Sequence, residues 1–362
     1  MSSFGPSILR KSHTRGKLAV AGIAAGVGLF VAGQTVNESV DAALLDDATA
    51  VAGSAKLTVL GGETGFPDSK LDAISSVPGV RAAVPLVMVR SKVAGRQVVV
   101  LGIDRRRESA VRVYRPAEGH VNGTPVDALT QADSVVVPAR LARALAIAPG
   151  GSIELMTAFG GLRLVIRDVV HESGAASAHG SNVVLMDIDA AREAFGRRDV
   201  VGRIDIVPGD AETIEALAGR IERVLGDGYR VELPEQDARR RIAMVGEYQS
   251  ILVLVGVLAL LVGMSLIAHV VVLSAAERRR ELAIRRVLGL SRGRLAAQLS
   301  VEASLLGLLG GVAAIPLAYV IGEALRAPIS SSMTFMYQTP IDVTTLRFST
   351  ANALAAPGIG VL

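Results

Sequence analysis

The 362-residue sequence contains no cysteine. This excludes a disulfide framework, a lipid-modified cysteine anchor and any thiolate metal site. The sequence also lacks the G-x-x-x-x-G-K-[ST] phosphate loop, the H-E-x-x-H zinc motif and the G-x-S-x-G serine elbow. The histidines His120, His171 and His179 show no metal-ligand spacing and are expected to be ordinary loop residues. We therefore predict no catalytic, cofactor-binding or metal-binding residue, and expect a chain that is not an enzyme.

Apolar residues are abundant instead. They make up 50% of the sequence, and the mean hydropathy is +0.45, at the apolar edge of soluble globular chains. They gather into three runs, Leu18–Val36, Ile251–Val272 and Leu295–Ile321. Each reaches the ~20 residues that a helix needs to cross ~30 Å of hydrocarbon. The predicted transmembrane helices are residues 18–36, 248–275 and 295–322.

Basic residues predict the orientation, because short loops rich in Lys and Arg stay in the cytoplasm. Such residues fill the tail 1–17 and the segment 276–294. Both are therefore expected inside, with residues 37–246 outside, in a multi-pass protein of a bacterial cell membrane. The net charge of +4 is explained by these anchors and by contact with the lipid bilayer, so we predict no nucleic-acid partner. A cleavable signal peptide is the alternative for the first run, but the run exceeds the usual ~7–15 apolar residues.

Residues 37–246 change to short strands and helices separated by turns, as in a folded α+β domain. A β-α-β-β unit opens this region, and a β-α-β unit closes it. Together they predict a split ferredoxin-like layer, interrupted by a β-rich insertion at about residues 104–198. Residues 233–248 are expected to form a helical stalk. The predicted strands are 56–60, 80–90, 96–103, 134–137, 152–156, 162–170, 183–186, 203–207 and 229–233, and the helices are 68–77, 139–146 and 211–225. The fold class is an α-helical membrane protein with a large extracytoplasmic α+β domain.

The segment 277–291 reads ERRRELAIRRVLGLS. As a helix it places Ile284, Val287 and Leu288 on one apolar stripe beside a charged rim, and Gly289 is a helix terminator. A short amphipathic helix of this kind can dock into a groove of a partner protein. A basic loop lying on anionic lipid is the alternative. The residues alone leave both interpretations open.

This segment closely resembles the signature that follows the second transmembrane helix in the FtsX/MacB-like permease family of ABC transporters. Residues 71–84 and 134–170 also look like elements of the family's outer domain. The family pattern is an E-R-x-x-E run ending in G-[AL]-S, then a glutamate early in the next span and a glycine-rich end. The matching positions are Glu277, Arg278, Glu281, Leu282, Ile284, Arg285, Arg286, Leu288, Gly289, Ser291, Glu302, Gly307, Gly310 and Gly311.

The resemblance implies a permease subunit that pairs with a second permease copy or half and binds a cytoplasmic ABC ATPase, where ATP would be bound. It would couple ATP hydrolysis to movement of the outer domain, for export or for mechanotransmission. The alternative is a membrane-anchored sensor or extracytoplasmic enzyme without an ATPase partner. The residues expected on the ATPase-coupling helix are Glu277, Arg278, Glu281, Leu282, Ile284, Arg285, Val287, Leu288 and Gly289.

Two ionisable residues fall inside predicted spans, His269 and Glu302. Ionisable groups in a membrane are functional candidates by default. They lie at similar depths, so they could pair with each other, or Glu302 could reach an interfacial arginine such as Arg286 or Arg294. Two G-x-x-x-G pairs, which permit close contact between helices, are Gly22 with Gly26 and Gly307 with Gly311.

Members of the family have a fourth span. Here residues 323–346 are predicted as an extracytoplasmic loop, and residues 347–362 as the start of an incomplete fourth span. We therefore expect that the sequence stops before this span ends, or that it is the first half of a longer permease. No motif on the outer region indicates a transported substrate.

Overall fold

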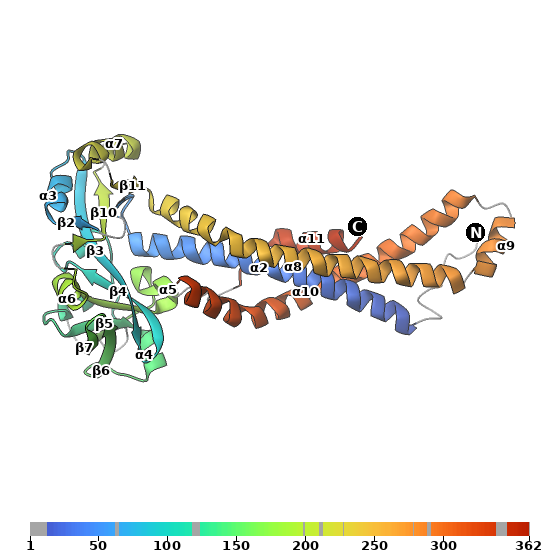
Figure 1. Cartoon of the computed structure of the whole chain (residues 1–362), viewed down its shortest axis with the longest axis horizontal. Helices are drawn as coiled ribbons and strands as arrows, with labels where there is room; N and C mark the ends of the chain where they lie inside the picture. The colour runs from blue at the N-terminus through green and yellow to red at the C-terminus, as the bar shows by residue number, and fades with distance from the viewer. Residues whose placement is uncertain are drawn as a thin grey trace. The chain divides into compact units, whose positions relative to one another are not determined.

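The computed structural model describes residues 13–61, 65–117, 124–197, 200–209, 213–226, 228–277, 279–287, 291–337 and 346–361 (Figure 1). The chain divides into two compact units. The helical unit contains Met1–Val40, Val245–Ile329 and Thr345–Leu362, and the outer unit contains Asp41–Met244 and Ser330–Thr344.

Long helices build the helical unit: α2 (His13–Ala52), α8 (Pro234–Glu277), α10 (Arg292–Tyr337) and the shorter α11 (Thr350–Val361). By length and composition, three segments within the described residues could cross a membrane: Ala19–Ala52, Val253–Glu277 and Arg292–Phe335. The core of the helical unit includes Ile23, Val27, Val31, Leu306, Ala314 and Ala356, the last of which lies on α11.

Two helices extend beyond the predicted spans. α2 continues past residue 36 to Ala52, and α10 continues through residues 323–337. The prediction of a loop at 323–346 was therefore wrong for its first part. Hydropathy falls where a chain leaves the bilayer, but it does not mark where a helix ends. Pro328 lies inside α10, although proline more often ends a helix.

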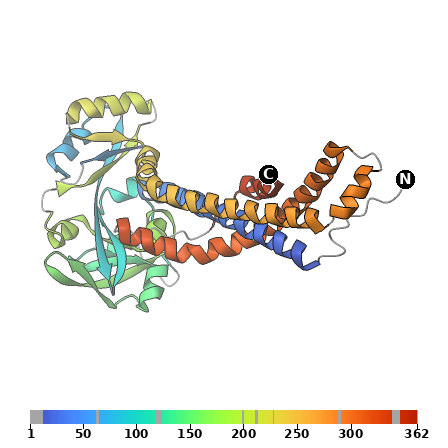
Figure 2. The same ribbon diagram turned by 45° about the vertical axis from the view of Figure 1, so that its right-hand side comes forward.

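The ferredoxin-like half of the outer unit is an antiparallel sheet in the order β11-β1-β10-β3. α3 and α7 connect the strands and pack against each other (Figure 2). Apolar side chains such as Leu57, Ile74, Ile204, Leu217 and Ile221 fill the core. The predicted split ferredoxin-like layer is thereby confirmed. The elements are β1 (Leu57–Leu60), α3 (Ser69–Ser75), β3 (Val80–Val93), β10 (Arg203–Pro208), α7 (Ile214–Leu225) and β11 (Arg230–Glu232), with a small separate sheet of β2 (Phe66–Pro67) and β9 (Val200–Val201).

The insertion closes into a small barrel. β3 is long enough to pair with β10 through its first half and with β4 through its second. The sheet then runs β4-β8-β5-β7-β6 and returns to β3, where Val93 pairs with Leu155 of β6. Branched aliphatic side chains such as Val100, Val135 and Ile166 fill its interior. The elements are β4 (Arg96–Ile103), β5 (Ser134–Pro138), α4 (Ala139–Leu145), β6 (Ser152–Thr157), β7 (Gly160–Val170), α5 (Ala178–Ser181), β8 (Val183–Asp187) and α6 (Ile188–Ala194).

Both long helices join the outer unit at neighbouring strands. α2 leads through residues 53–56 into β1, and β11 leads through Leu233 into α8. β1 and β11 pair antiparallel, with Thr58 opposite Glu232. The end of α2 and the start of α8 therefore lie at the same end of one edge of the sheet.

Candidate functional site

The predicted coupling segment contains a separate short helix, α9 (Arg279–Val287), between α8 and α10. Ile284 is 54% exposed and Val287 is 89% exposed. Because residues three apart share a helix face, the two form an exposed aliphatic pair. Of the other predicted coupling residues, Glu277 ends α8, Glu281, Leu282 and Arg285 lie on α9, and Arg278, Leu288 and Gly289 lie outside the described residues.

The glycines predicted for helix packing lie at close contacts inside the helical unit. A Cβ atom added at Gly26 would lie 2.8 Å from the carbonyl oxygen of Ala259, and one at Gly22 would collide with the Leu266 side chain. α2 and α8 therefore approach more closely here than larger residues permit. In the same way, Gly311 and Gly307 lie against Ala356 and Gly360 of α11.

His269 lies on α8 and Glu302 on α10. The imidazole Nδ1 of His269 is 2.9 Å from the carbonyl oxygen of Ser265, one turn earlier in its own helix. A carbonyl oxygen only accepts, so this contact favours the tautomer that carries the proton on Nδ1. The pairing of His269 with Glu302 stays a prediction.

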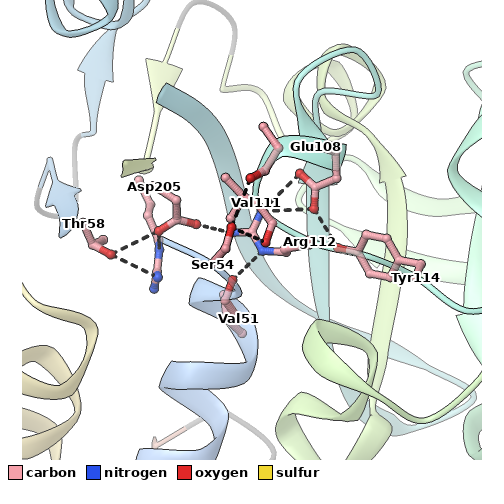
Figure 3. Close-up of polar contacts among 10 residues, drawn as sticks. Val51, Ser54, Thr58, Glu108, Val111, Arg112, Tyr114 and Asp205 are labelled. Carbon is pink, nitrogen blue, oxygen red and sulfur yellow. Dashed lines mark hydrogen bonds and ion pairs between the residues drawn. The ribbon is translucent and has the colours of Figure 1, made fainter. Parts of the chain in front are cut away.

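The outer unit contains a buried charged cluster that the sequence did not reveal (Figure 3). Arg112 follows the short 3-10 helix η1 (Glu108–Ala110) and is 3% exposed. Its Nη1 donates to the Glu108 carboxylate at 3.0 Å, its Nη2 donates to Asp205, and its Nε donates to the carbonyl oxygen of Val51 on α2. One guanidinium thus joins α2, η1 and strand β10.

The cluster continues into the sheet. Asp205 of β10 has no exposed surface, and it also accepts hydrogen bonds from Arg203 at 2.6 Å and from Thr58 of β1 at 3.1 Å. Tyr114 donates its hydroxyl proton to Glu108 at 2.8 Å. Two cationic and two anionic side chains therefore balance in the interior, as buried charges require.

The C-terminal end of α2 fits closely against this cluster. Gly53 has φ +59°, and a Cβ atom there would collide with the Val111 carbonyl. Ser54 donates its backbone N–H to that carbonyl at 2.9 Å, and its hydroxyl to the Ala110 carbonyl at 3.0 Å. The Arg112 guanidinium also lies at the negative end of the helix dipole of α2. The end of α2 is consequently capped by the segment 108–112.

Electrostatics favour a permanently charged Arg112. Burial by itself lowers the pKa of the Arg112 guanidinium, but Asp205 and Glu108 outweigh burial and raise that pKa above its ordinary value. Burial raises the pKa of the Glu108 carboxyl group, and Arg112 and Tyr114 offset this only in part. Burial also raises the pKa of Tyr114 well above its ordinary value. Folding therefore favours the protonated form of Glu108 relative to the unfolded chain.

This shift predicts how stability depends on pH. Because the folded-state pKa of Glu108 lies above 4.5, its contribution is fully present below about pH 4.5 and is lost as the pH rises through the folded-state pKa. We expect the unfolding free energy of the wild type to increase relative to that of Glu108→Gln as the pH falls from 7 to 4.5. Pulse proteolysis of the full chain in urea measures this difference. The exposed control Glu222→Gln should show no such trend, and a difference that shrinks on acidification would contradict the prediction.

A second contact holds α2 from the barrel side. His179, Gly180 and Ser181 all have left-handed backbone angles, with φ +54°, +64° and +61°, which costs roughly 1–2 kcal/mol for each non-glycine residue. The His179 backbone N–H donates to Asp47 of α2 at 2.8 Å, and its ring Nδ1 lies 3.2 Å from the same carboxylate. Arg140 donates to the Gly180 carbonyl at 3.1 Å. His179, expected to be an ordinary loop residue, is thus buried against α2, while His120 lies outside the described residues.

Among the residues that the structure describes, no three histidine, aspartate or glutamate side chains gather to hold a metal ion. Two features stand out among the described residues: the exposed pair on α9 and the buried cluster at the end of α2. Apolar helices of membrane-spanning length, together with a ferredoxin-like half and a barrel, define a membrane protein with a large extracytoplasmic domain.

Matches to two protein-family models agree with this class of protein and narrow it to one family. Residues 18–224 match the MacB-like periplasmic core domain, and residues 253–362 match the FtsX-like permease C-terminal domain. The chain belongs to the FtsX/MacB-like permease family of ABC transporters.

Relatives carry the same description. An uncharacterised ABC transporter permease of Mycobacterium tuberculosis is 26% identical over 349 residues, covering 95% of this chain and 40% of the relative. Another from Methanocaldococcus jannaschii is 28% identical over 151 residues, covering 40% of this chain and 38% of the relative. The chain thus spans two fifths or less of the length of these two relatives.

Two solved structures are similar to part of this chain. The extracellular domain of the noncanonic ABC-type transporter YknZ from Gram-positive bacteria has a TM-score of 0.39 at 15% identity, covering 49% of this chain and 98% of that domain. The periplasmic region of MacB from Actinobacillus actinomycetemcomitans has a TM-score of 0.39 at 11% identity, covering 54% of this chain and 96% of that region.

Proposed function

We propose that the chain is the transmembrane permease subunit of an ABC transporter, and that it couples ATP hydrolysis by a separate ATPase subunit to movement of its outer domain. The observation that carries this proposal is α9, a short helix between two apolar helices that exposes Ile284 and Val287. An exposed aliphatic pair with a charged rim suits a groove on a protein partner.

The remaining features of the proposal follow from the same assignment. The basic tail and α9 lie in the cytoplasm, since arginine-rich short segments stay there. ATP is bound by the partner, in keeping with the lack of a phosphate loop in this sequence. A second permease copy or half completes the membrane part. The moving element is the outer domain, which serves export or transmits force.

Purification of the tagged full chain from its native membranes, with any ABC ATPase that is bound to it, tests the proposal. We expect the ATPase to co-purify in mild detergent and the complex to hydrolyse ATP in a vanadate-sensitive manner. Mass spectrometry identifies the partner. A chain that is purified intact from the membrane without an ATPase, and without nucleotide hydrolysis, would contradict the proposal and favour a sensor or enzyme.

A further inference from the structure

The outer end of α2 is held by buried contacts. The Arg112 and Asp205 side chains are 1% and 0% exposed, and Arg112 links the last turn of α2 to β10, a strand inside the sheet. Ser54 adds two hydrogen bonds to residues 110 and 111. Asp47, nearly two turns earlier, holds the left-handed turn at His179. Contacts to both halves of the outer unit therefore hold one helix end.

The start of α8 is held differently. It follows β11, a three-residue strand at the edge of the sheet, after the single residue Leu233. The Gln236 side chain accepts a hydrogen bond from the Leu233 N–H at 3.2 Å. The ion pair between Arg240 and Glu232, at 2.7 Å, leaves the arginine side chain 44% exposed and the glutamate side chain 10% exposed. This ion pair between α8 and the sheet is therefore open to water on its arginine side.

The α2 joint is the end of α2 with residues 53–56, and the α8 joint is Leu233 with the start of α8. These two joints resist bending unequally. Opening the buried cluster would leave charges unpaired in a medium of low dielectric, which is strongly unfavourable. Loosening the ion pair between Arg240 and Glu232 costs less than opening this cluster, because the arginine side chain is 44% exposed and can be solvated by water. We infer that the α2 joint is rigid and the α8 joint yields, so that α2 carries the outer domain with it and the backbone around Leu233 is the pivot. The inference rests on the proposed function, because that function supplies the motion.

The positions of the joints give this asymmetry a mechanical effect. The joints belong to the paired strands β1 and β11. Helices that pack side by side have axes ~9 Å apart, and helix shifts in switching proteins are ~1–2 Å. With one joint rigid and the other yielding, an axial shift of ~1.5 Å between helices ~9 Å apart would rotate the outer domain by about 10°.

Because the sequence contains no cysteine, a spin label attaches only at cysteines that are introduced by mutation. One pair of labels, Thr49→Cys with Ala216→Cys, measures the distance between α2 and α7 and is called the α2 pair. A second, Arg239→Cys with Ala216→Cys, measures the distance between α8 and α7 and is called the α8 pair. All three positions are exposed. Distances are measured by double electron–electron resonance on the full chain with its ATPase in lipid nanodiscs, without nucleotide and with ATP plus vanadate. We expect the α2 pair to keep one narrow distribution in both states and the α8 pair to shift by several ångströms.

Variants test the joint itself without nucleotide. Arg112→Met should at least double the width of the α2-pair distribution, while the matched control Arg240→Ala, which removes the half-exposed arginine, should leave it unchanged. If protease sensitivity shows that Arg112→Met is unfolded, the width of the α2-pair distribution is measured in Arg112→Lys instead. Lysine keeps the charge but cannot reach three partners at once, so the same broadening is expected.

The outcomes separate the two proposals. A nucleotide-dependent change in the α2 pair, or a fixed α8 pair in a complex that hydrolyses ATP, overturns the unequal joints and leaves the proposed function standing. An α2-pair distribution that stays narrow in folded Arg112 variants also overturns them. Failure of the proposed function appears separately, as the lack of a co-purifying ATPase, and the nucleotide-free comparison still tests the joint.

Discussion

Ile284→Asp should abolish co-purification of the ATPase while the chain stays in the membrane. Ile284 is 54% exposed on α9, so the change costs the free chain little. In a complex the same position would be desolvated, and an unpaired carboxylate there is strongly unfavourable. Central interface residues commonly contribute about 2–4 kcal/mol, so the expected loss is roughly 30-fold to several hundred-fold in affinity. Recovery of the ATPase on a tagged chain in mild detergent measures it.

Two controls separate docking from general damage. Val113→Asp introduces the same group at an aliphatic residue that is 76% exposed on the outer unit, and it should leave co-purification unchanged. Extraction of the variant from membranes only by detergent shows that it is inserted. Retention of the ATPase by Ile284→Asp, together with weaker binding of α9 to anionic vesicles, would support the lipid-surface alternative instead.

Much of the outer fold follows from local pattern. β4 was predicted at residues 96–103, and it occupies Arg96–Ile103, because a run of β-branched residues is bounded here by the Ala94-Gly95 turn and by Asp104. The two halves of the ferredoxin-like layer were likewise visible as strand and helix periods. Alternation of apolar side chains specifies which residues form a strand, and turn residues specify where it ends.

The partners of strands could not be read in the same way. Closure of the barrel depends on Val93 meeting Leu155, residues far apart in the sequence whose local patterns give no sign of each other. The length of β3 was underestimated for a related reason, because its last residues, Ser91–Val93, are stabilised by pairing with β4. Non-local pairing of this kind is a property of the assembled sheet.

The charged cluster escaped prediction because its pattern also fits a solvent-facing surface. In β10, Arg203 and Asp205 alternate with Ile204 and Ile206. This alternation is typical of a strand with one solvent-exposed face and one buried face. Both faces are in fact buried. Arg112 stands among many arginines near residue 107, and no local feature distinguishes it from its exposed neighbours. Charge pairing across the fold made burial possible, and that pairing is invisible in one segment.

Asp205→Ala should produce the largest loss of stability in the outer unit. The Asp205 carboxylate is fully buried and accepts from Arg112, Arg203 and Thr58. Its removal leaves two buried guanidinium groups, those of Arg112 and Arg203, and one buried carboxylate, that of Glu108. Breaking a buried ion pair from one side typically costs about 3–5 kcal/mol, a large share of the ~5–15 kcal/mol that stabilises a domain. Pulse proteolysis of the full chain in urea should show a midpoint shift of that size.

The matched control is Asp133→Ala, since Asp133 pairs with Arg167 while 47% of its side chain is exposed. Such surface pairs contribute about 0–1 kcal/mol, so a similar loss in both variants would mean that burial does not matter at Asp205. A second change sharpens the argument. Adding Arg203→Met to Asp205→Ala should recover part of the lost stability, because it removes one of the uncompensated charges. If the two losses simply add, Arg203 is not held by this carboxylate, and the cluster does not act as a unit.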